Sequence, residues 1–164
     1  MDFSPFSIHP IAPADDAAIA AIVRANLEQF HLNIPGTVYF DPELDHLSAF
    51  YTARPDRRGY FILTDENGTV IGGVGYAEFD GLPDCCELQK LYLTDAAKGV
   101  GLGKKLMRLV VEQAGMAGYR TLYLETHTNL TTAVHIYEKM GFRRIEKPEC
   151  VNHSTMDTFF VMEV

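Results

Sequence analysis

The segment KGVGLGKKLMRLVV, residues 98–111, places three glycines at alternate positions immediately before an apolar helical stripe. The glycines leave backbone N–H groups unobstructed, and the helix that begins among them directs the positive end of its dipole to the same place. The three lysines of the segment are mildly unfavourable at a helix N-terminus, by about 0.3–1 kcal/mol each, unless an anion lies between them. The segment therefore predicts a phosphate-binding loop that opens a helix over residues 102–117, with a plain tight turn as the alternative.

Two common nucleotide-binding loops are excluded by the spacing of these glycines. A P-loop, GxxxxGK[ST], needs a glycine five residues before Gly103, where Lys98 stands. The dinucleotide fingerprint GxGxxG needs a third glycine where Lys104 stands. A phosphate group must therefore be held by a loop of another kind.

Hydrophobic periodicity predicts the elements on either side of the loop. After a short apolar stretch at 6–11, two helices come first and three strands follow, of which the first two form a hairpin around Asn67-Gly68. Beyond the loop helix, a crossover leads to a parallel strand, a helix that ends at Met140 and is capped by Asn129 or Thr131, and two final strands. The expected ranges are 13–30 and 43–51 for the first helices, 59–64, 69–79 and 86–93 for the first strands, 121–125 for the parallel strand, and 142–146 and 156–164 for the last two.

The strand expected over 86–93 leads to the loop and carries polar residues on both faces near its start. Strict alternation places Glu87 and Gln89 on one face together with Leu91 and Leu93. The strand before it contains three glycines, at positions 72, 73 and 75. These glycines weaken that strand unless a bulge or a closely approaching backbone needs the room.

Length and charge limit the class of protein. The chain has 164 residues, of which 47% are hydrophobic and 22% are charged, so we expect one globular domain over residues 1–164. The net charge of −8 argues against a surface that neutralises nucleic-acid phosphates, and it steers cationic partners toward the protein. We therefore expect no nucleic-acid partner.

The cysteines, histidines and N-terminal residues predict a cytoplasmic protein without a metal. Three cysteines, Cys85, Cys86 and Cys150, form no CxxC pair or disulfide framework and are interpreted as reduced, inert thiols. His127, His135 and His153 show no metal-ligand spacing. The N-terminus has no basic leader, and no apolar run approaches about 18 residues, so neither export nor a membrane partner is expected.

Lys98-Gly99-Val100-Gly101-Leu102-Gly103 resembles the phosphate loop of the GNAT superfamily of acyl-CoA-dependent N-acyltransferases, whose pattern is (Arg or Gln)-x-x-Gly-x-(Gly or Ala). Both glycines of the pattern match, and Lys98 replaces the usual Arg or Gln. A second stretch, NLTTAVHIYEKMGF, is similar to the later signature of the superfamily, with Asn129, Tyr137 and the pair Gly141-Phe142 in the corresponding places. The resemblance covers about residues 60–164.

The resemblance implies a fold, a cofactor and a set of binding residues. The fold is an α/β (α+β) GNAT-like domain with a mixed, mostly antiparallel central sheet that is flanked by helices and splayed at its central strands. The cofactor is acetyl-CoA, which serves as the acyl donor for direct transfer to an amine in a ternary complex. The residues expected to bind it are Leu91 and Leu93 through their backbones, the loop residues Lys98, Gly99, Val100, Gly101, Leu102, Gly103 and Lys104, and Asn129.

Transfer to an amine needs a base, because an alkyl ammonium has a pKa near ~10. Glu87 is the candidate, since it lies on the strand before the loop, where some members of the superfamily keep a glutamate base. Glu125 or water is the alternative base. Alternatively, Glu87 is a surface or strand-edge glutamate without a catalytic role. Tyr137 carries a phenol that remains protonated at neutral pH and is expected to donate to the departing thiolate, with a buried core tyrosine as the alternative.

The acceptor is not readable beyond a primary amine of a small molecule or peptide. Acidic residues around the second helix and the central strands favour a cationic acceptor, namely Asp41, Glu43, Asp45, Glu78, Asp80 and Asp84. His153 and Asp157, near the last hairpin, are further candidates for the acceptor pocket. A silent CoA-binding sensor, an interaction domain and a homodimeric assembly all remain open.

Overall fold

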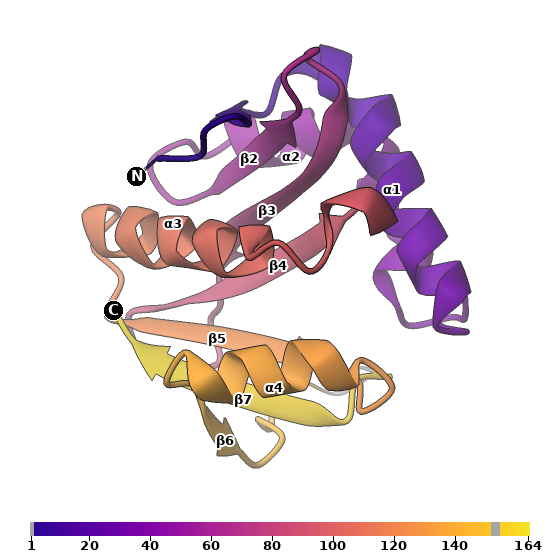
Figure 1. Cartoon of the computed structure of the whole chain (residues 1–164). Coiled ribbons are helices and arrows are strands. Elements are labelled where there is room, and N and C mark those ends of the chain that lie inside the picture. The colour runs from indigo at the N-terminus through magenta and orange to yellow at the C-terminus, as the bar shows by residue number, and fades with distance from the viewer. Residues whose placement is uncertain (1, 152–154) are drawn as a thin grey trace.

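The computed structural model describes residues 2–151 and 155–164 and contains a seven-stranded sheet flanked by helices (Figure 1). The strand order is β1-β2-β3-β4-β5-β7-β6, and every neighbouring pair is antiparallel except β4 and β5, which are parallel. The expected mixed, mostly antiparallel sheet is thus confirmed. The strands are β1 Ser7–Pro10, β2 Gly59–Thr64, β3 Val70–Glu78, β4 Cys85–Leu93, β5 Thr121–Thr126, β6 Arg143–Ile145 and β7 Thr158–Glu163.

The predicted helices form close to their expected positions. They are α1 Asp16–Gln29, α2 Leu47–Thr52, α3 Leu102–Met116 and α4 Thr131–Lys139, with short 3-10 turns at Pro13–Asp15 before α1 and Leu44–His46 before α2. The expected cap of the last helix was wrong. Leu130 takes the N-cap position without a side-chain hydrogen bond, because the chain turns earlier, through the bond from the Leu130 N–H to the His127 carbonyl.

β1 is a strand that local periodicity did not predict. Its four residues pair with β2 at the edge of the sheet, from Ser7 opposite Thr64 to Pro10 opposite Phe61. A segment this short carries almost no periodic signal, and a terminal proline is tolerated only because the strand lies at an edge. The strand forms because β2 offers it a partner.

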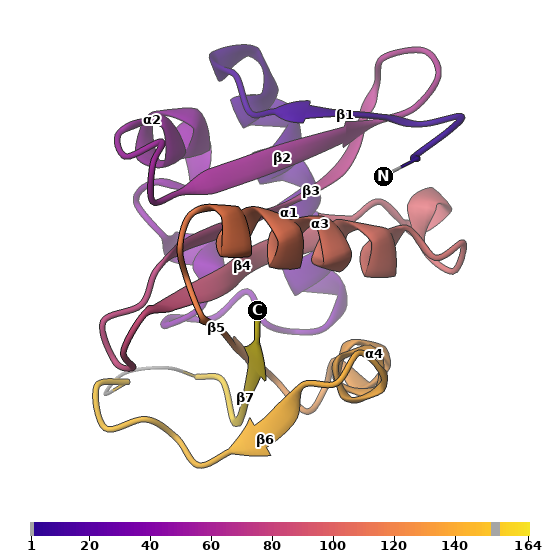
Figure 2. The same cartoon turned by 90° about the vertical axis from the view of Figure 1, so that its left-hand side faces the viewer.

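Helices cover both faces of the sheet. α3 buries Leu106, Met107 and Val110 against one face. α1 buries Ile19 and Val23 against the other, where α2 also packs, so that α3 and α1 lie on opposite sides of the central strands (Figure 2). In each helix the apolar stripe is the side that turns toward the sheet.

The glycines of β3 make room for an aromatic ring of β2. A Cβ atom added at Gly73 would lie 2.6 Å from the Tyr60 ring, and one added at Gly75 would lie 2.5 Å from it. Contacts this short are not found between real side chains. The backbone of β2 also approaches closely, since the same Cβ atoms would lie 2.9 Å from the Phe61 carbonyl oxygen and 2.8 Å from the Gly59 carbonyl oxygen, so the expected close approach of a backbone is confirmed.

β4 carries one extra residue where its register against β3 shifts. Lys90 lies at this bulge in the left-handed region, with a φ of +51°. A bulge of one residue reverses the faces of all following side chains. Leu91 and Leu93 therefore pack in the core under α3, whereas Gln89 bonds Tyr51 on the opposite face. The expectation that the odd-numbered residues from 87 to 93 share one face was wrong, because strict alternation holds only in an unbulged strand.

Gly75→Ala is expected to destabilise the protein by about 1–3 kcal/mol, because the new methyl group must displace the Tyr60 ring or the Gly59 carbonyl. Thermal unfolding of the purified protein measures the effect. Gly115→Ala in α3 is the matched control, since a Cβ at Gly115 meets no atom within 4 Å and alanine favours the helix. Equal melting temperatures for Gly75→Ala and the parent would contradict the steric argument.

Candidate active site

β4 and β5 separate after a short parallel ladder. Their pairing extends only from Cys85 opposite Thr121 to Glu87 opposite Tyr123, although β4 continues to Leu93. Beyond this point β4 stays paired with β3 and β5 stays paired with β7, so the two halves of the sheet diverge (Figure 1). The predicted splay of the central strands is therefore present, and Glu87 lies where it begins.

A cavity of about 610 Å³ occupies the opening between these strands. Its walls come from α1, the divergent part of β4, the loop before α3, the end of β5 and α4. Eight of the predicted site residues line it, namely Leu91, Leu93, Lys98, Gly99, Gly101, Gly103, Lys104 and Tyr137. The structure thus brings together most of the predicted site residues, whereas Glu87 is not among the residues that line this cavity.

Three predicted binding residues do not line the cavity. The Val100 side chain is 63% exposed at the tip of the loop, and Leu102 is buried in the core beneath it. Asn129 is exposed just before α4, where its backbone N–H donates to His127 Nδ1 at 3.1 Å. Their side chains therefore contribute nothing to the cavity wall in this conformation.

The glycine loop has the geometry of an anion cradle. Gly99 and Gly101 have φ values of +82° and +85°, a region that side chains rarely adopt. Gly101 is the N-cap of α3, no side chain of the described residues caps this helix, and its first turn contains no acidic residue. The first N–H groups of α3 are thus left for a ligand, and Lys98 and Lys104 lie beside them at the cavity.

Glu87 is half-buried and is held by a short hydrogen-bonded chain. The Tyr51 hydroxyl donates to Gln89 Oε1 at 2.8 Å, which turns the Gln89 amide N–H toward Glu87 Oε2, 2.7 Å away. Burial raises the pKa of Glu87 to about 7, and the nearby Glu125 carboxylate adds to the rise, whereas the Gln89 hydrogen bond opposes it. The pKa of this carboxyl therefore lies near neutral pH, well above the usual range of a glutamate.

Glu125 faces the opening from the other strand. It lines the cavity, and its Oε2 accepts a hydrogen bond from the Tyr123 hydroxyl at 3.0 Å. Two carboxylates therefore stand on either side of the point where β4 and β5 part.

Tyr137 lies on α4 with 8% of its surface exposed, packed against Phe142 and Phe160. Burial raises its pKa to about 12, so the phenol is protonated at neutral pH. Within the described residues the Tyr137 hydroxyl makes no hydrogen bond. Every fully buried polar side-chain atom there has a partner, so this oxygen is not fully buried. The hydroxyl is therefore open to the cavity that Tyr137 lines.

Three of the six acidic residues expected near the acceptor are already paired within the chain. Asp45 forms two hydrogen bonds with Arg24 at 2.7 and 2.9 Å, and Asp41 lies 3.4 Å from the Lys90 ammonium. Glu78 accepts hydrogen bonds from Arg54 and Arg58, and the bond from Arg58 lowers the pKa of Glu78 to about 2. Among the described residues, Glu43, Asp80 and Asp84 form no ion pair.

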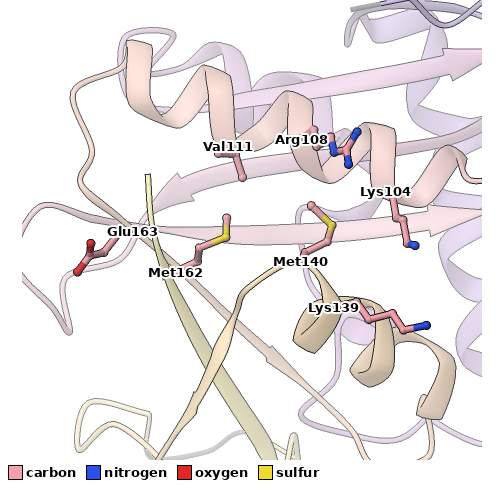
Figure 3. A pocket seen from close by; sticks show the side chains of 7 residues that line it. All are labelled: Lys104, Arg108, Val111, Lys139, Met140, Met162 and Glu163. Carbon is pink, nitrogen blue, oxygen red and sulfur yellow. The ribbon is translucent and has the colours of Figure 1, made fainter.

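A second groove of about 370 Å³ lies between α3 and the end of α4, next to β7 (Figure 3). Lys104 and Arg108 reach it from α3, and Lys139 reaches it from the end of α4. Met140 and Met162 form part of its apolar wall. Three cationic side chains and one carboxylate, that of Glu163, thus line this cationic groove, and because Lys104 also lines the main cavity, the groove adjoins the glycine loop.

Other candidate sites are not supported. Asp157 accepts from the Thr128 backbone and hydroxyl rather than lining the cavity, and His153 lies outside the described residues. Burial raises the pKa of Cys85 to about 11 and that of Cys86 to about 12, so both thiols are protonated. In residues 2–151 and 155–164, no three metal-binding side chains gather, and no helix has the length and apolar character needed to cross a bilayer.

Comparisons with known proteins agree with this geometry. The profile of the Acetyltransferase (GNAT) family matches residues 19–142. The chain is 36% identical over 153 residues to the uncharacterized N-acetyltransferase YjgM of Escherichia coli K12, a match that covers 92% of this chain and 90% of the relative.

Two solved structures show the same fold. A GNAT-family acetyltransferase from Staphylococcus aureus Mu50 has a TM-score of 0.83 at 16% identity, over 96% of this chain and 98% of that one. YncA from Salmonella typhimurium, determined with acetyl-CoA, has a TM-score of 0.74 at 22% identity, over 96% and 93%. With a family match over most of its length and a separated strand pair beside a glycine loop, this chain belongs to the GNAT family of acetyltransferases.

Proposed function

We propose that this protein transfers the acetyl group of acetyl-CoA to a primary amine of a small molecule or peptide, by direct attack within a ternary complex. The observation that carries the proposal is the opening between β4 and β5, which leads to the glycine loop and has Glu87 where it begins. YncA, which shares this fold, was determined with acetyl-CoA. The donor is therefore assigned from the fold and from the cavity together.

The cavity residues fit acetyl-CoA in size and charge. A volume of about 610 Å³ lies within the usual range for small-molecule sites. The uncapped N–H groups of α3, with Lys98 and Lys104, suit a pyrophosphate, and the unpaired backbone groups of β4 suit the amides of a pantetheine arm. The cationic groove with Arg108 and Lys139 suits the additional phosphate of the CoA nucleotide. When bound, acetyl-CoA supplies an activated thioester.

Glu87 is assigned as the base that removes a proton from the acceptor ammonium. Its pKa of about 7 is well matched to proton transfer near neutral pH. Gln89 holds the carboxylate in one orientation, and Tyr51 in turn holds Gln89. Glu125 and water remain the alternative bases.

Tyr137 is assigned as the donor to the departing thiolate. Its hydroxyl is protonated, open to the cavity and held in place by two neighbouring aromatic rings. A hydrogen bond to sulfur strengthens as the sulfur gains negative charge, so it stabilises the transition state more than the bound thioester.

The carboxylates of Glu87 and Glu125 favour an acceptor with positive charge. They stand together where the strands part, and the unpaired Glu43, Asp80 and Asp84 add negative charge elsewhere on the described chain. Exposed charges attract a ligand only within about 8–10 Å at physiological ionic strength. The attraction should therefore appear as a capture step that depends on salt.

A screen of acetyl-CoA consumption tests the proposed function. The panel contains polyamines, aminoglycosides and peptide N-termini, each matched with a neutral or anionic amino compound of similar size. We expect cationic amines to react best, with a kcat/KM that falls as salt rises. Binding of acetyl-CoA in calorimetry without turnover of any amine would favour a silent sensor, and failure to bind would favour an interaction domain.

Glu87→Gln is expected to lower kcat by about 10²–10⁴-fold. In the parent, kcat/KM should fall as the pH drops through about 7, because protonation of Glu87 removes the base. Gln89→Leu should shift this inflection to higher pH, since its amide stabilises the carboxylate. Glu66→Gln, in the exposed β2–β3 turn, is the control for loss of a carboxylate. An unchanged inflection in Glu87→Gln would assign the base elsewhere.

Tyr137→Phe is expected to lower kcat about tenfold, the effect of one lost hydrogen bond, and to change acetyl-CoA affinity much less. Steady-state kinetics and calorimetry measure the two effects separately. Tyr76→Phe removes a hydroxyl from the same core cluster away from the cavity and serves as the control. If Tyr137→Phe retains full turnover, Tyr137 has no role in the chemical step.

A further inference from the structure

Asn26 interrupts the buried stripe of α1. Ile19, Ile22, Val23 and Leu27 follow helical spacing toward the sheet, and Asn26 takes the next position on the same face. Its side chain is 9% exposed and lines the cavity between β4 and β5. A polar residue in such a position needs hydrogen-bond partners to offset its burial.

Two backbone carbonyls fix the orientation of the Asn26 amide. Nδ2 donates to Ile22 O, one turn earlier in α1, and to Leu93 O at the end of β4, each at 2.9 Å. Both partners only accept hydrogen bonds, so the NH2 group must face them. The oxygen, Oδ1, is thereby turned away from both.

The Leu93 carbonyl needs this bond because it has lost a strand partner. The N–H of Thr94, the first residue beyond β4, donates to Ile71 O of β3 at 2.9 Å, so the backbone of Thr94 faces β3. Successive residues of a strand point their backbone N–H and C=O groups to opposite sides. Leu93, which is paired with Gly72, therefore points its backbone groups away from β3. The Leu93 carbonyl therefore faces the side from which β5 has already departed, and Asn26 takes the place of the missing strand.

Oδ1 of Asn26 remains available to a ligand. In the described part of the chain no group donates a hydrogen bond to Oδ1. Every fully buried polar side-chain atom there has a partner, so Oδ1 is not fully buried. The oxygen is therefore open to the cavity that Asn26 lines. An amide oxygen is an acceptor only, so a ligand must meet it with a donor such as an amide N–H.

We propose that Asn26 is a positioning residue for the acyl donor: its NH2 group holds the Leu93 carbonyl at the open end of β4, and its Oδ1 accepts a hydrogen bond from an amide N–H of the pantetheine arm. This inference rests on the proposed function, because it requires acetyl-CoA in the cavity. Leu93 lies six residues beyond Glu87, about 20 Å along an extended strand. Asn26 therefore acts on binding of the arm, away from the reacting atoms.

Asn26→Leu tests the proposal, since leucine has a similar size and suits the apolar stripe of α1. Calorimetry compares two probes, acetyl-CoA and phosphoadenosine diphosphate, the nucleotide half of CoA that lacks the pantetheine arm. We expect the dissociation constant of acetyl-CoA to rise about tenfold, with less than a twofold change for the nucleotide. The KM for acetyl-CoA should rise correspondingly, with little change in kcat. Ala25→Leu, on the exposed face of the same helix, is the matched control.

Asn26→Asp provides a second variant of nearly identical shape that lacks the NH2 group, and it should weaken acetyl-CoA selectively as well. Unchanged acetyl-CoA affinity in either folded variant would overturn the proposal. Equal weakening of both probes would also overturn it, because a general distortion of the fold affects the glycine loop and the arm alike. If the parent protein binds the nucleotide but not acetyl-CoA, the donor assignment fails and this inference fails with it.

Discussion

The separation of β4 from β5 after three residue pairs is the constraint on which the site depends. A strand that leaves its neighbour must satisfy its backbone groups in another way. In this chain the Lys90 carbonyl, at the bulge, accepts a hydrogen bond from the Tyr60 hydroxyl at 2.8 Å, and the Leu93 carbonyl accepts one from Asn26. Both donors come from the N-terminal half of the chain. That half of the chain therefore supplies hydrogen-bond partners to β4 beyond its ladder with β5, as well as covering the sheet.

Local burial, rather than net charge, determines the chemistry at this opening. The protein carries a net charge of −8, but Asp41, Asp45 and Glu78 are neutralised by basic residues of the same chain. Glu87 differs because it is half-buried beside a second carboxylate, and within the described part of the chain it receives one hydrogen bond, from the neutral Gln89 amide. Its raised pKa follows from that environment, and no count of charges along the chain predicts it.

Features that depend on a few neighbouring residues were predictable. Gly99 and Gly101 adopt the positive φ values that their loop requires, and Gly75 leaves the space that its position in β3 suggested. The bulge at Lys90 was not predictable, because the strand contains neither glycine nor proline there and the left-handed residue is a lysine. The bulge arises from pairing with β3, and it moved Leu91 and Leu93 to the face opposite that of Glu87.

The sequence by itself determined the glycine loop, the helix after it and the chain order of the elements from β2 onward, because each of these is expressed in local spacing. Glu87 and Tyr137 became candidates through the resemblance to the GNAT superfamily, together with the chemistry of a carboxylate and a phenol. Tertiary structure alone decided which groups meet. Tyr51 reaches Gln89 across 38 positions of the chain, and Asn26 reaches Leu93 across 67. Such contacts form because packing brings backbone carbonyls and side chains that are distant in the sequence within hydrogen-bond distance. Burial removes water as their partner, so these groups bond to each other. No periodicity along the chain encodes which groups will meet.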